Sequence, residues 1–352
     1  MAANISLEPF RGDIEGLEKM ALTSWREEYG IESFPNLYRP DFLRFLFDRL
    51  PDKTHLIAAY RGGEIVSFLA NLPRLMSFRG RTYRSVYTCL LVTRREMLRK
   101  GIATAIIQEA LRLNKNYKYD FSLLGLERGH HSTVMVKKLE ESGHPVGWVK
   151  QFSVVARILD LERVFASEEV KAWERAALRL LRVHCPPKER CRVRLREYRS
   201  EDIEACLALL NQYKEKIELA RVWDRQELAW ELDYPGVSQT LVCEREGSIV
   251  GLINFILHDH HGKVKERWAW INHVAYPHLN PRERYEFIQA FLRYIKEAGC
   301  IGAVEWTRGY HPMAPLFRSR FFPYFRAVNL VSWTFNPDLS IQKIPAVYEV
   351  QI

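Results

Sequence analysis

Three features that mark other classes of protein are missing from this sequence. It has no run of about 18 apolar residues, the length that crosses a bilayer as a helix, so we expect no membrane span. Its N-terminal residues include neither a basic nor an apolar segment of the kind that directs export, so we expect a cytoplasmic protein. The six cysteines form no Cys-x-x-Cys pair and no regular framework, so we expect reduced thiols.

A long basic tail is also absent, although the net charge is +9, from 52 basic and 43 acidic residues. Part of the excess lies between Arg179 and Arg196, but Glu189 interrupts this stretch and no aromatic residue is interleaved with it. We interpret the stretch as a solvated linker helix followed by an edge strand. Nucleic acid is therefore not an expected partner.

The rest of the chain is organised around the stretch from Leu90 to Leu113. A short apolar strand runs into a basic turn, and an amphipathic helix starts near Gly101. Gly101 and Ala103 leave the backbone uncovered where the helix begins, and the helix dipole is positive there. Full positive charges are added by Arg94, Arg95, Arg99 and Lys100. This pattern favours a pyrophosphate at the helix start and a long ligand along the strand.

The elements before this stretch can be read from hydrophobic periodicity and turn signals. The sequence predicts a strand at 5–10, helices at 13–28 and from Pro40, and strands at 56–60, 65–72 and 85–92. Arg61 to Glu64 is a hairpin turn signal. After the central helix we expect a strand at 121–126, a helix near 134–142 and strands at 146–149 and 152–159.

This order, together with the loop from Leu98 to Ala103, resembles the GNAT acyltransferase superfamily. Its loop R/Q-x-x-G-x-G/A holds the pyrophosphate of acetyl-CoA; Gly101 and Ala103 match the loop, and Leu98 departs from it. The resemblance implies acetyl-CoA, or another acyl-CoA, as cosubstrate. The implied binding residues are Leu91, Val92, Thr93, Arg94, Arg99, Lys100, Gly101, Ile102, Ala103 and Thr104.

The second half repeats the first, because the stretch from Leu195 to Glu204 echoes that from Leu7 to Glu15. It predicts helices at 200–213, 225–232 and 281–298, a short helix at 315–320, and strands at 240–244, 249–257, 267–276 and 303–306, with final strands to 335. We therefore expect an α/β (α+β) fold of two tandem GNAT-like domains, each a mixed, mostly antiparallel sheet flanked by helices. Their expected bounds are 1–160 and 191–352, with a linker helix in 161–190.

The second copy is expected to be degenerate at the loop. Aligning the loop with 282–287 places Tyr285 and Phe287 where glycine and alanine would stand, and bulky side chains there block backbone approach to a pyrophosphate. Glu283 and Glu286 would also repel it. Only the first copy is therefore expected to bind CoA. A tandem pair with one working loop resembles the enhanced-intracellular-survival acetyltransferases, the mycothiol-synthase group and the Fem-type peptidyltransferases.

Acyl transfer to an amine needs a base, an oxyanion partner and an acid for the thiolate. Superfamily members often place a glutamate on the strand entering the loop, but residues 85–90 contain none, and Leu139 occupies the place of the usual acidic tyrosine. Glu127, His130 and the neighbouring His131 follow the next strand, a position that faces the acyl group in the superfamily. We therefore select Glu127 and His130 as catalytic residues, with Tyr87 as the acid. Cys89 is a weaker candidate, as a covalent nucleophile.

No metal is expected. His258, Asp259, His260 and His261 crowd together, but neighbours on a hairpin turn diverge, and no ligand at structural zinc spacing accompanies them, so a polar turn is the preferred interpretation. Polar and aromatic residues alternate along one later strand face and follow another strand; they are candidates for lining an acceptor cleft between the domains, although core packing explains the tryptophans as well. They are Trp268, Trp270, Asn272, Glu305, Trp306 and Arg308.

The sequence therefore predicts an acetyl-CoA-dependent N-acyltransferase with an unidentified amine acceptor. Two other hypotheses remain open. One is an acyl-CoA-binding sensor without turnover, since Leu98 and Leu139 replace superfamily residues; the other is a Fem-like transferase that uses aminoacyl-tRNA.

Overall fold

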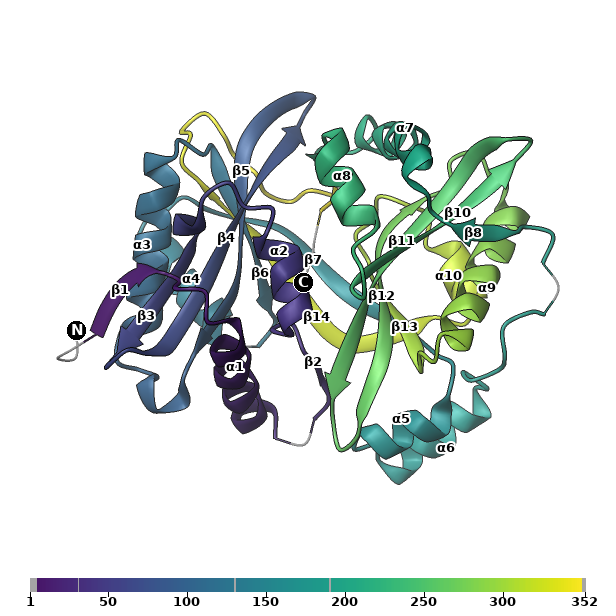
Figure 1. Cartoon of the computed structure of the whole chain (residues 1–352), viewed down its shortest axis with the longest axis horizontal. Helices are drawn as coiled ribbons and strands as arrows, with labels where there is room; N and C mark the ends of the chain where they lie inside the picture. The colour runs from purple at the N-terminus through teal and green to yellow at the C-terminus, as the bar shows by residue number, and fades with distance from the viewer. Residues whose placement is uncertain (1–4, 31, 130, 190, 350–352) are drawn as a thin grey trace.

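The computed structural model describes residues 5–30, 32–129, 131–189 and 191–349 (Figure 1). The first half follows the predicted order of elements. They are β1 (Ile5–Pro9), α1 (Ile14–Tyr29), β2 (Phe34–Pro35), α2 (Pro40–Phe47), β3 (Leu56–Arg61), β4 (Glu64–Phe78), β5 (Arg81–Thr93), α3 (Ile102–Asn116), β6 (Phe121–Glu127), α4 (His131–Glu141) and β7 (Val146–Ile158). Local chemistry sets the helix starts: the Asp13 carboxylate accepts a hydrogen bond from the Gly16 N–H before α1, and Pro40 is the first residue of α2.

The second half has the same general order. Its elements are α5 (Leu161–Ser167), α6 (Ala172–Leu180), β8 (Leu195–Glu197), α7 (Ile203–Lys214), β9 (Leu219–Val222), α8 (Arg225–Leu232), β10 (Ser238–Arg245), β11 (Ser248–His261), β12 (Lys265–Ala275), α9 (Pro281–Glu297), β13 (Gly302–Trp306), α10 (Ala314–Arg318), β14 (Phe322–Thr334) and β15 (Val347–Tyr348). The interval expected to hold one linker helix contains two short ones, α5 and α6. The two strands expected between 146 and 159 are a single strand, β7.

One sheet runs through both halves, in the order β1-β3-β4-β5-β6-β14-β7-β13-β12-β11-β10-β8. The last long strand, β14, lies between β6 and β7, while β7 pairs on its other side with β13 of the second half. Each half is thus completed by a strand from the other, as the yellow β14 shows when it crosses to the blue strands in Figure 1. The fold is one large, mixed, mostly antiparallel sheet that spans both halves and is flanked by helices, with β8 at one edge as expected.

Helices cover both faces of the first-half sheet. Residues of α3 pack on β3 and β4 in one apolar cluster that includes Ile106 and Leu69. The other face packs against α1 and α2, where Leu17 and Phe42 join a larger cluster that includes Phe68. The core therefore lies on both sides of β4 and β5, the strands that lead to the site.

The interpretation of 258–261 as a turn is wrong. These residues continue β11, paired with β12 as far as His261 opposite Lys265, and β2 adds to the other side of His260. His258 is fully buried, with its ring 4.8 Å from that of Phe42 and 5.6 Å from that of Trp270. Aromatic partners distant in sequence, rather than local turn chemistry, decide the conformation. Among the described residues, no group of three His, Cys, Asp or Glu side chains is placed to hold a metal ion.

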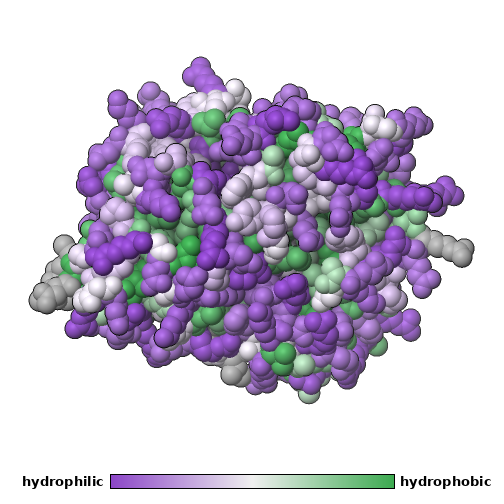
Figure 2. Space-filling view, in the orientation of Figure 1, coloured by the Kyte–Doolittle hydropathy of each residue, from purple (hydrophilic) through white to green (hydrophobic). Residues whose placement is uncertain are grey.

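The surface is mixed in character. The face in Figure 2 is mostly hydrophilic, with hydrophobic residues scattered over it, in keeping with the charged composition. Within the described ranges, no helix combines the length and apolar character needed to cross a membrane.

Candidate functional site

The first-half sheet opens between β5 and β6. These parallel strands pair only from Ser85 to Thr88 on β5 and from Phe121 to Leu124 on β6. Beyond that point β5 continues to Thr93 and β6 to Glu127 without pairing to each other. The result is a gap in the sheet whose open end points toward the basic loop.

A bulge in β5 lies beside this gap. The pairing of β4 with β5 shifts between Phe68, opposite Val92, and Ala70, opposite Cys89. Two residues, Leu90 and Leu91, therefore stand where the ladder has room for one, and Leu90 has a φ of 55°, uncommon for a leucine. Bulges leave backbone groups outside the ladder and often mark functional sites.

The basic loop ends at an uncapped helix. Gly101 is the N-cap of α3 with a φ of 78°, a left-handed conformation that favours glycine, and no side chain caps the first turn. Met97 is buried and anchors the loop, while Leu98, Arg99 and Lys100 are exposed. The N–H groups of the first turn thus face outward beside two exposed cations.

The corresponding helix of the second half is closed by its own side chains. At the start of α9, Asn280 accepts hydrogen bonds from the N–H groups of Arg282 and Glu283, and Glu283 accepts one from the Asn280 N–H. The position equivalent to Gly101 is therefore Asn280, and the alignment that put Tyr285 and Phe287 at the loop is wrong, because both lie inside α9. The second loop still differs from the first, but for another reason. Side chains of α9 already accept hydrogen bonds from the N–H groups at its start, and the carboxylate of Glu283 lies there.

Some of the basic side chains around the first loop are engaged by other protein groups, and others are not. Arg94 forms an ion pair with Glu64 at 2.9 Å, and Arg95 donates to the Glu27 carbonyl at 3.4 Å. Within the described part of the chain, Arg99 and Lys100 have no carboxylate within 4 Å. These two cations are the ones left to meet an anion.

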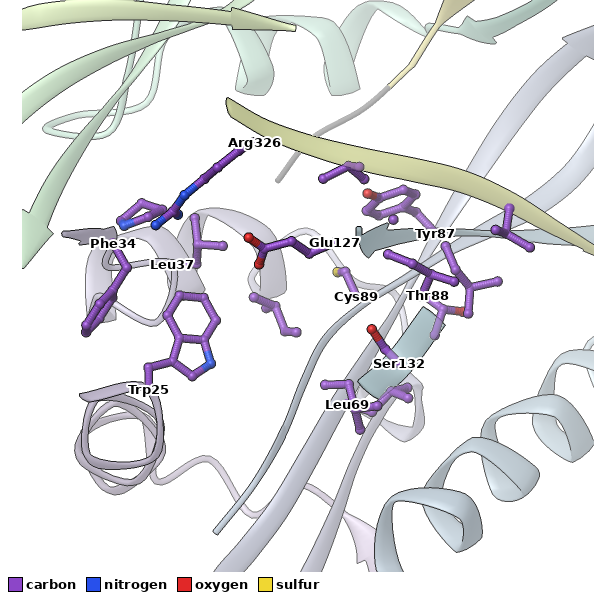
Figure 3. A pocket seen from close by; sticks show the side chains of 18 of the residues that line it. Trp25, Phe34, Leu37, Leu69, Tyr87, Thr88, Cys89, Glu127, Ser132 and Arg326 are labelled. Carbon is purple, nitrogen blue, oxygen red and sulfur yellow. The ribbon is translucent and has the colours of Figure 1, made fainter. Parts of the chain in front are cut away.

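A single cavity of about 340 Å³ runs through the gap. One arm lies on the α3 and α4 face, where its wall includes Leu69, Ile107, Leu124 and Met135. The other arm lies between the halves, with a wall that includes Trp25, Phe34 and Tyr38 from the first half and His260, Trp268, Trp270 and Trp306 from the second. The cavity therefore joins the gap between β5 and β6 to the seam between the two halves (Figure 3).

The predicted catalytic residues have different places. Glu127, at the end of β6, reaches into the cavity between Cys89 and Leu37, as Figure 3 shows. His130 lies outside the described residues. His131 is the exposed first residue of α4 and is not part of the cavity wall.

Tyr87 and Cys89 also line the cavity, on β5. Burial raises the pKa of the Tyr87 phenol well above its ordinary value, so the phenol is protonated at neutral pH. Its oxygen would lie 2.8 Å from a Cβ at Gly125, which shows how closely that glycine lets the phenol approach β6. Burial raises the pKa of the Cys89 thiol to about 12, so this thiol is a poor nucleophile.

The second-half candidates separate into two groups. Trp268, Trp270 and Trp306 line the cavity, as the acceptor-cleft hypothesis requires. Asn272 instead donates to the buried Glu231 at 2.8 Å, and Arg308 pairs with the buried Glu305 at 2.8 Å. The tryptophans thus belong to the site, whereas the polar candidates form buried structural contacts.

Several cavity residues were not selected from the sequence: Trp25, Glu28, Phe34, Tyr38, Glu168, Tyr324 and Arg326. They come from α1, the segment around β2, the end of α5 and β14. Arg326 lies where the pairing of β14 with β7 shifts between Tyr324 and Ala327, and Figure 3 shows its guanidinium reaching toward Phe34. No local motif marks these residues, because pairing of distant strands brings them together.

Comparison with known proteins agrees with this architecture. Residues 25–125 match the family model described as an acetyltransferase (GNAT) domain. No curated protein matches the sequence.

Solved structures resemble the whole chain. One crystal structure of Saccharomyces cerevisiae N-myristoyltransferase with bound myristoyl-CoA has a TM-score of 0.78 at 14% identity, covering 100% of this chain and 86% of that one. Another has a TM-score of 0.77 at 15% identity, with 100% and 90% covered. A GCN5-related N-acetyltransferase from Kribbella flavida has a TM-score of 0.53 at 12% identity, with 95% and 71% covered. At these identities the likeness establishes the fold alone.

Proposed function

We propose that this protein, a tandem-domain member of the GNAT superfamily, transfers an acyl group from acyl-CoA to an amine. The observation that carries the proposal is the continuous cavity. It connects the gap between β5 and β6, at Leu90 and Leu91, with carboxylates and tryptophans at the seam between the halves. A donor and an acceptor that enter from opposite arms would meet at the gap, as direct transfer in a ternary complex requires.

The first half would hold the donor. The pyrophosphate would accept hydrogen bonds from the first turn of α3, with Arg99 and Lys100 supplying positive charge. The pantetheine would follow β5 past Val92 and Leu91 to the bulge at Leu90. There, backbone N–H groups left outside the ladder would stabilise the thioester oxygen as it becomes negative.

The acyl group would be longer than acetyl. Beyond the gap the first arm of the cavity, which we call the acyl arm, continues between the strands and helices α3 and α4, and its wall is largely apolar. A two-carbon group would leave this space unused, whereas an alkyl chain gains about 25 cal/mol for each Å² of apolar surface that it buries. Acetyl-CoA, the donor implied by the loop, is therefore the shortest donor to test rather than the preferred one.

The other arm of the cavity, between the two halves, would receive the acceptor, and we call it the acceptor arm. Its charged groups favour an amine. The described ionisable groups of its wall include the carboxyl groups of Glu28, Glu127 and Glu168 and one guanidinium, that of Arg326. Burial raises the pKa of Glu168, and Arg326 partly offsets this effect. An excess of carboxylates attracts an ammonium group, although the protein as a whole is positively charged.

The chemistry follows from the positions of two side chains. Glu127 would take the proton from the ammonium, directly or through one water, so that the amine nitrogen can attack the thioester carbon. The carbon–sulfur bond then breaks, the new amide keeps the acyl group, and the leaving thiolate of CoA needs a proton. Tyr87, whose hydroxyl lies beside the gap at Gly125, would supply it.

The test is thiol release from acetyl-, octanoyl- and myristoyl-CoA across a panel of amines, with the wild-type protein and two variants. Ala110, buried on α3, lines the first arm, so Ala110→Phe should abolish release from the longer donors and retain release from acetyl-CoA. Gln108→Phe, on the exposed side of the same helix, is the matched control.

CoA calorimetry on each variant shows whether it is folded. Tight CoA binding without thiol release from any donor would favour an acyl-CoA sensor. Equal loss of acetyl and longer donors in a folded Ala110→Phe protein would contradict the assignment of the acyl arm.

A further inference from the structure

The arm that would receive the acyl group is not uniformly apolar. Thr88, Ser122 and Asn114 are part of its wall, among neighbours that include Leu69, Leu124 and Val331. Ser122 and Leu124 lie on the same face of β6, since they are two residues apart, and Leu124 packs with α4. The polar side chains therefore belong to the same layer as the apolar wall.

Two of these residues, Thr88 and Asn114, are joined through Asn71 in a chain of hydrogen bonds. The Thr88 hydroxyl donates to Asn71 Oδ1 at 2.7 Å, and Asn71 Nδ2 donates to Asn114 Oδ1 at 3.1 Å. This arrangement uses the amide oxygen of Asn114 and orients its Nδ2 as the remaining donor.

Asn114, at the end of this chain of hydrogen bonds, and Ser122, which is outside it, each carry a polar group that has no hydrogen-bond partner among the described residues. Asn114 and Ser122 are each 1% exposed, and neither Asn114 Nδ2 nor Ser122 Oγ forms a hydrogen bond within the described part of the protein. Most buried polar groups in native proteins are satisfied, and leaving one unsatisfied is costly. Two such groups in the wall of one cavity leave an amide N–H and a hydroxyl available to a polar group of a ligand.

Their position corresponds to the acyl chain rather than to CoA. Ser122 lies two residues before Leu124, where the pairing of β5 and β6 ends, which is about 7 Å further into the closed part of the sheet. Asn114 is twelve residues beyond Ile102, or about 18 Å along α3 from the proposed pyrophosphate site. A group placed there would be several carbons beyond the thioester.

From these observations we propose that the acyl group of the donor carries an oxygen function, a hydroxyl or a keto group, well along its chain. The oxygen accepts a hydrogen bond from Asn114 Nδ2, and Ser122 Oγ donates to it or accepts from its hydroxyl. The inference rests on the proposed function and specifies its donor. A saturated chain of the same length would leave both polar groups unpaired, and sites built for a hydroxyl discriminate strongly against analogues that lack it.

The experiment compares hexanoyl-, octanoyl- and decanoyl-CoA with their ω-hydroxy counterparts in the thiol-release assay. We expect kcat/KM to favour the hydroxylated donor by about tenfold or more in at least one pair, the ratio that corresponds to one satisfied buried group. In Ser122→Ala and Asn114→Leu this ratio should fall toward one or reverse.

Ser85→Ala is the matched control, because Ser85 is a buried β5 residue outside the cavity wall whose hydroxyl donates to the Arg74 carbonyl. It should keep the wild-type ratio. Since Asn114→Leu can also disturb folding, Ser122→Ala alone is sufficient to decide the outcome.

The possible results separate the two proposals. Equal turnover of saturated and hydroxylated donors in every pair would overturn this inference, would mean that the two groups bind trapped water only, and would leave acyl transfer intact. Absence of thiol release and of CoA binding with every donor would instead remove the proposed function on which the inference rests.

Discussion

Gly101 offers the sharpest test of where the donor binds, because substitutions there can separate an effect on protein stability from an effect on CoA affinity. Its φ of 78° costs about 1–2 kcal/mol for any residue with a Cβ, yet a Cβ built there meets nothing within 4 Å. Gly299 is a matched control, with a φ of 84° and the same open surroundings in the second half. Alanine should therefore destabilise the protein similarly at both positions.

Glutamate adds a charge to this backbone effect. A carboxylate about 5 Å from one phosphate charge is repelled by about 1 to 3 kcal/mol, for effective dielectric constants between those of water and of a protein surface. We therefore expect Gly101→Glu to weaken CoA binding by at least about tenfold. Gly299→Glu should lose stability but not affinity.

Calorimetric titration with CoA at low and high salt, alongside thermal melts of all four variants, measures both effects. Because salt screens exposed charges, the difference between the two glutamate variants should narrow as salt rises. Wild-type CoA affinity in a folded Gly101→Glu protein would refute the assignment of the pyrophosphate to the start of α3.

Three further outcomes are expected. Glu127→Gln and Tyr87→Phe should each lower kcat by about 10² to 10⁴ while leaving the CoA dissociation constant unchanged, and a fall in affinity without a fall in kcat would show that these residues bind rather than catalyse. Burial lowers the pKa of His258 from 6.5 to about 3, so the unfolded chain binds more protons between these values and stability should fall as pH drops below 6.5. Melts of His258→Leu from pH 7 to pH 4 should show a smaller loss, and an unchanged pH slope would contradict the neutral buried imidazole. Binding of tRNA should be no tighter than nonspecific, about 10⁻⁴ to 10⁻⁶ M at physiological salt, because Arg179 and Arg196 are paired with carboxylates at 2.9 and 2.7 Å. Submicromolar, tRNA-selective filter binding without CoA affinity would favour the Fem-like alternative.

The loop and the order of elements could be predicted because their determinants are local. Gly101 takes a conformation that favours glycine, Pro40 starts a helix, and the turn at Gly62 and Gly63 joins two strands of the expected spacing. Each depends on residues within a few positions in the chain. For the same reason the tandem fold was visible, since it needs only that one local pattern occurs twice.

Other expectations failed where distant residues decide. His258 was assigned to a turn from its polar neighbours, but the rings of Phe42 and Trp270 bury it in a strand. By contrast, the loop alignment failed for a local reason: α9 does begin at Pro281 as predicted, but the glycine position was aligned with Tyr285, five residues beyond the Asn280 N-cap, although Asn280 and Glu283 are a local capping signal. The catalytic assignments of Glu127 and Tyr87 stay predictions, and both side chains do reach the same cavity.

Only the tertiary structure decided the acceptor arm and the polar end of the acyl arm. Pairing of β14 with β6 and β7 brings Arg326 beside the α1–α2 segment, although nearly 300 residues separate Arg326 from Phe34. Similarly, Asn114 and Ser122 lie on a helix and a strand whose separate patterns give no hint that they border one cavity. Hydrophobic periodicity determines which face of an element is buried, but the energy that selects partners comes from packing between elements, which a single sequence does not display.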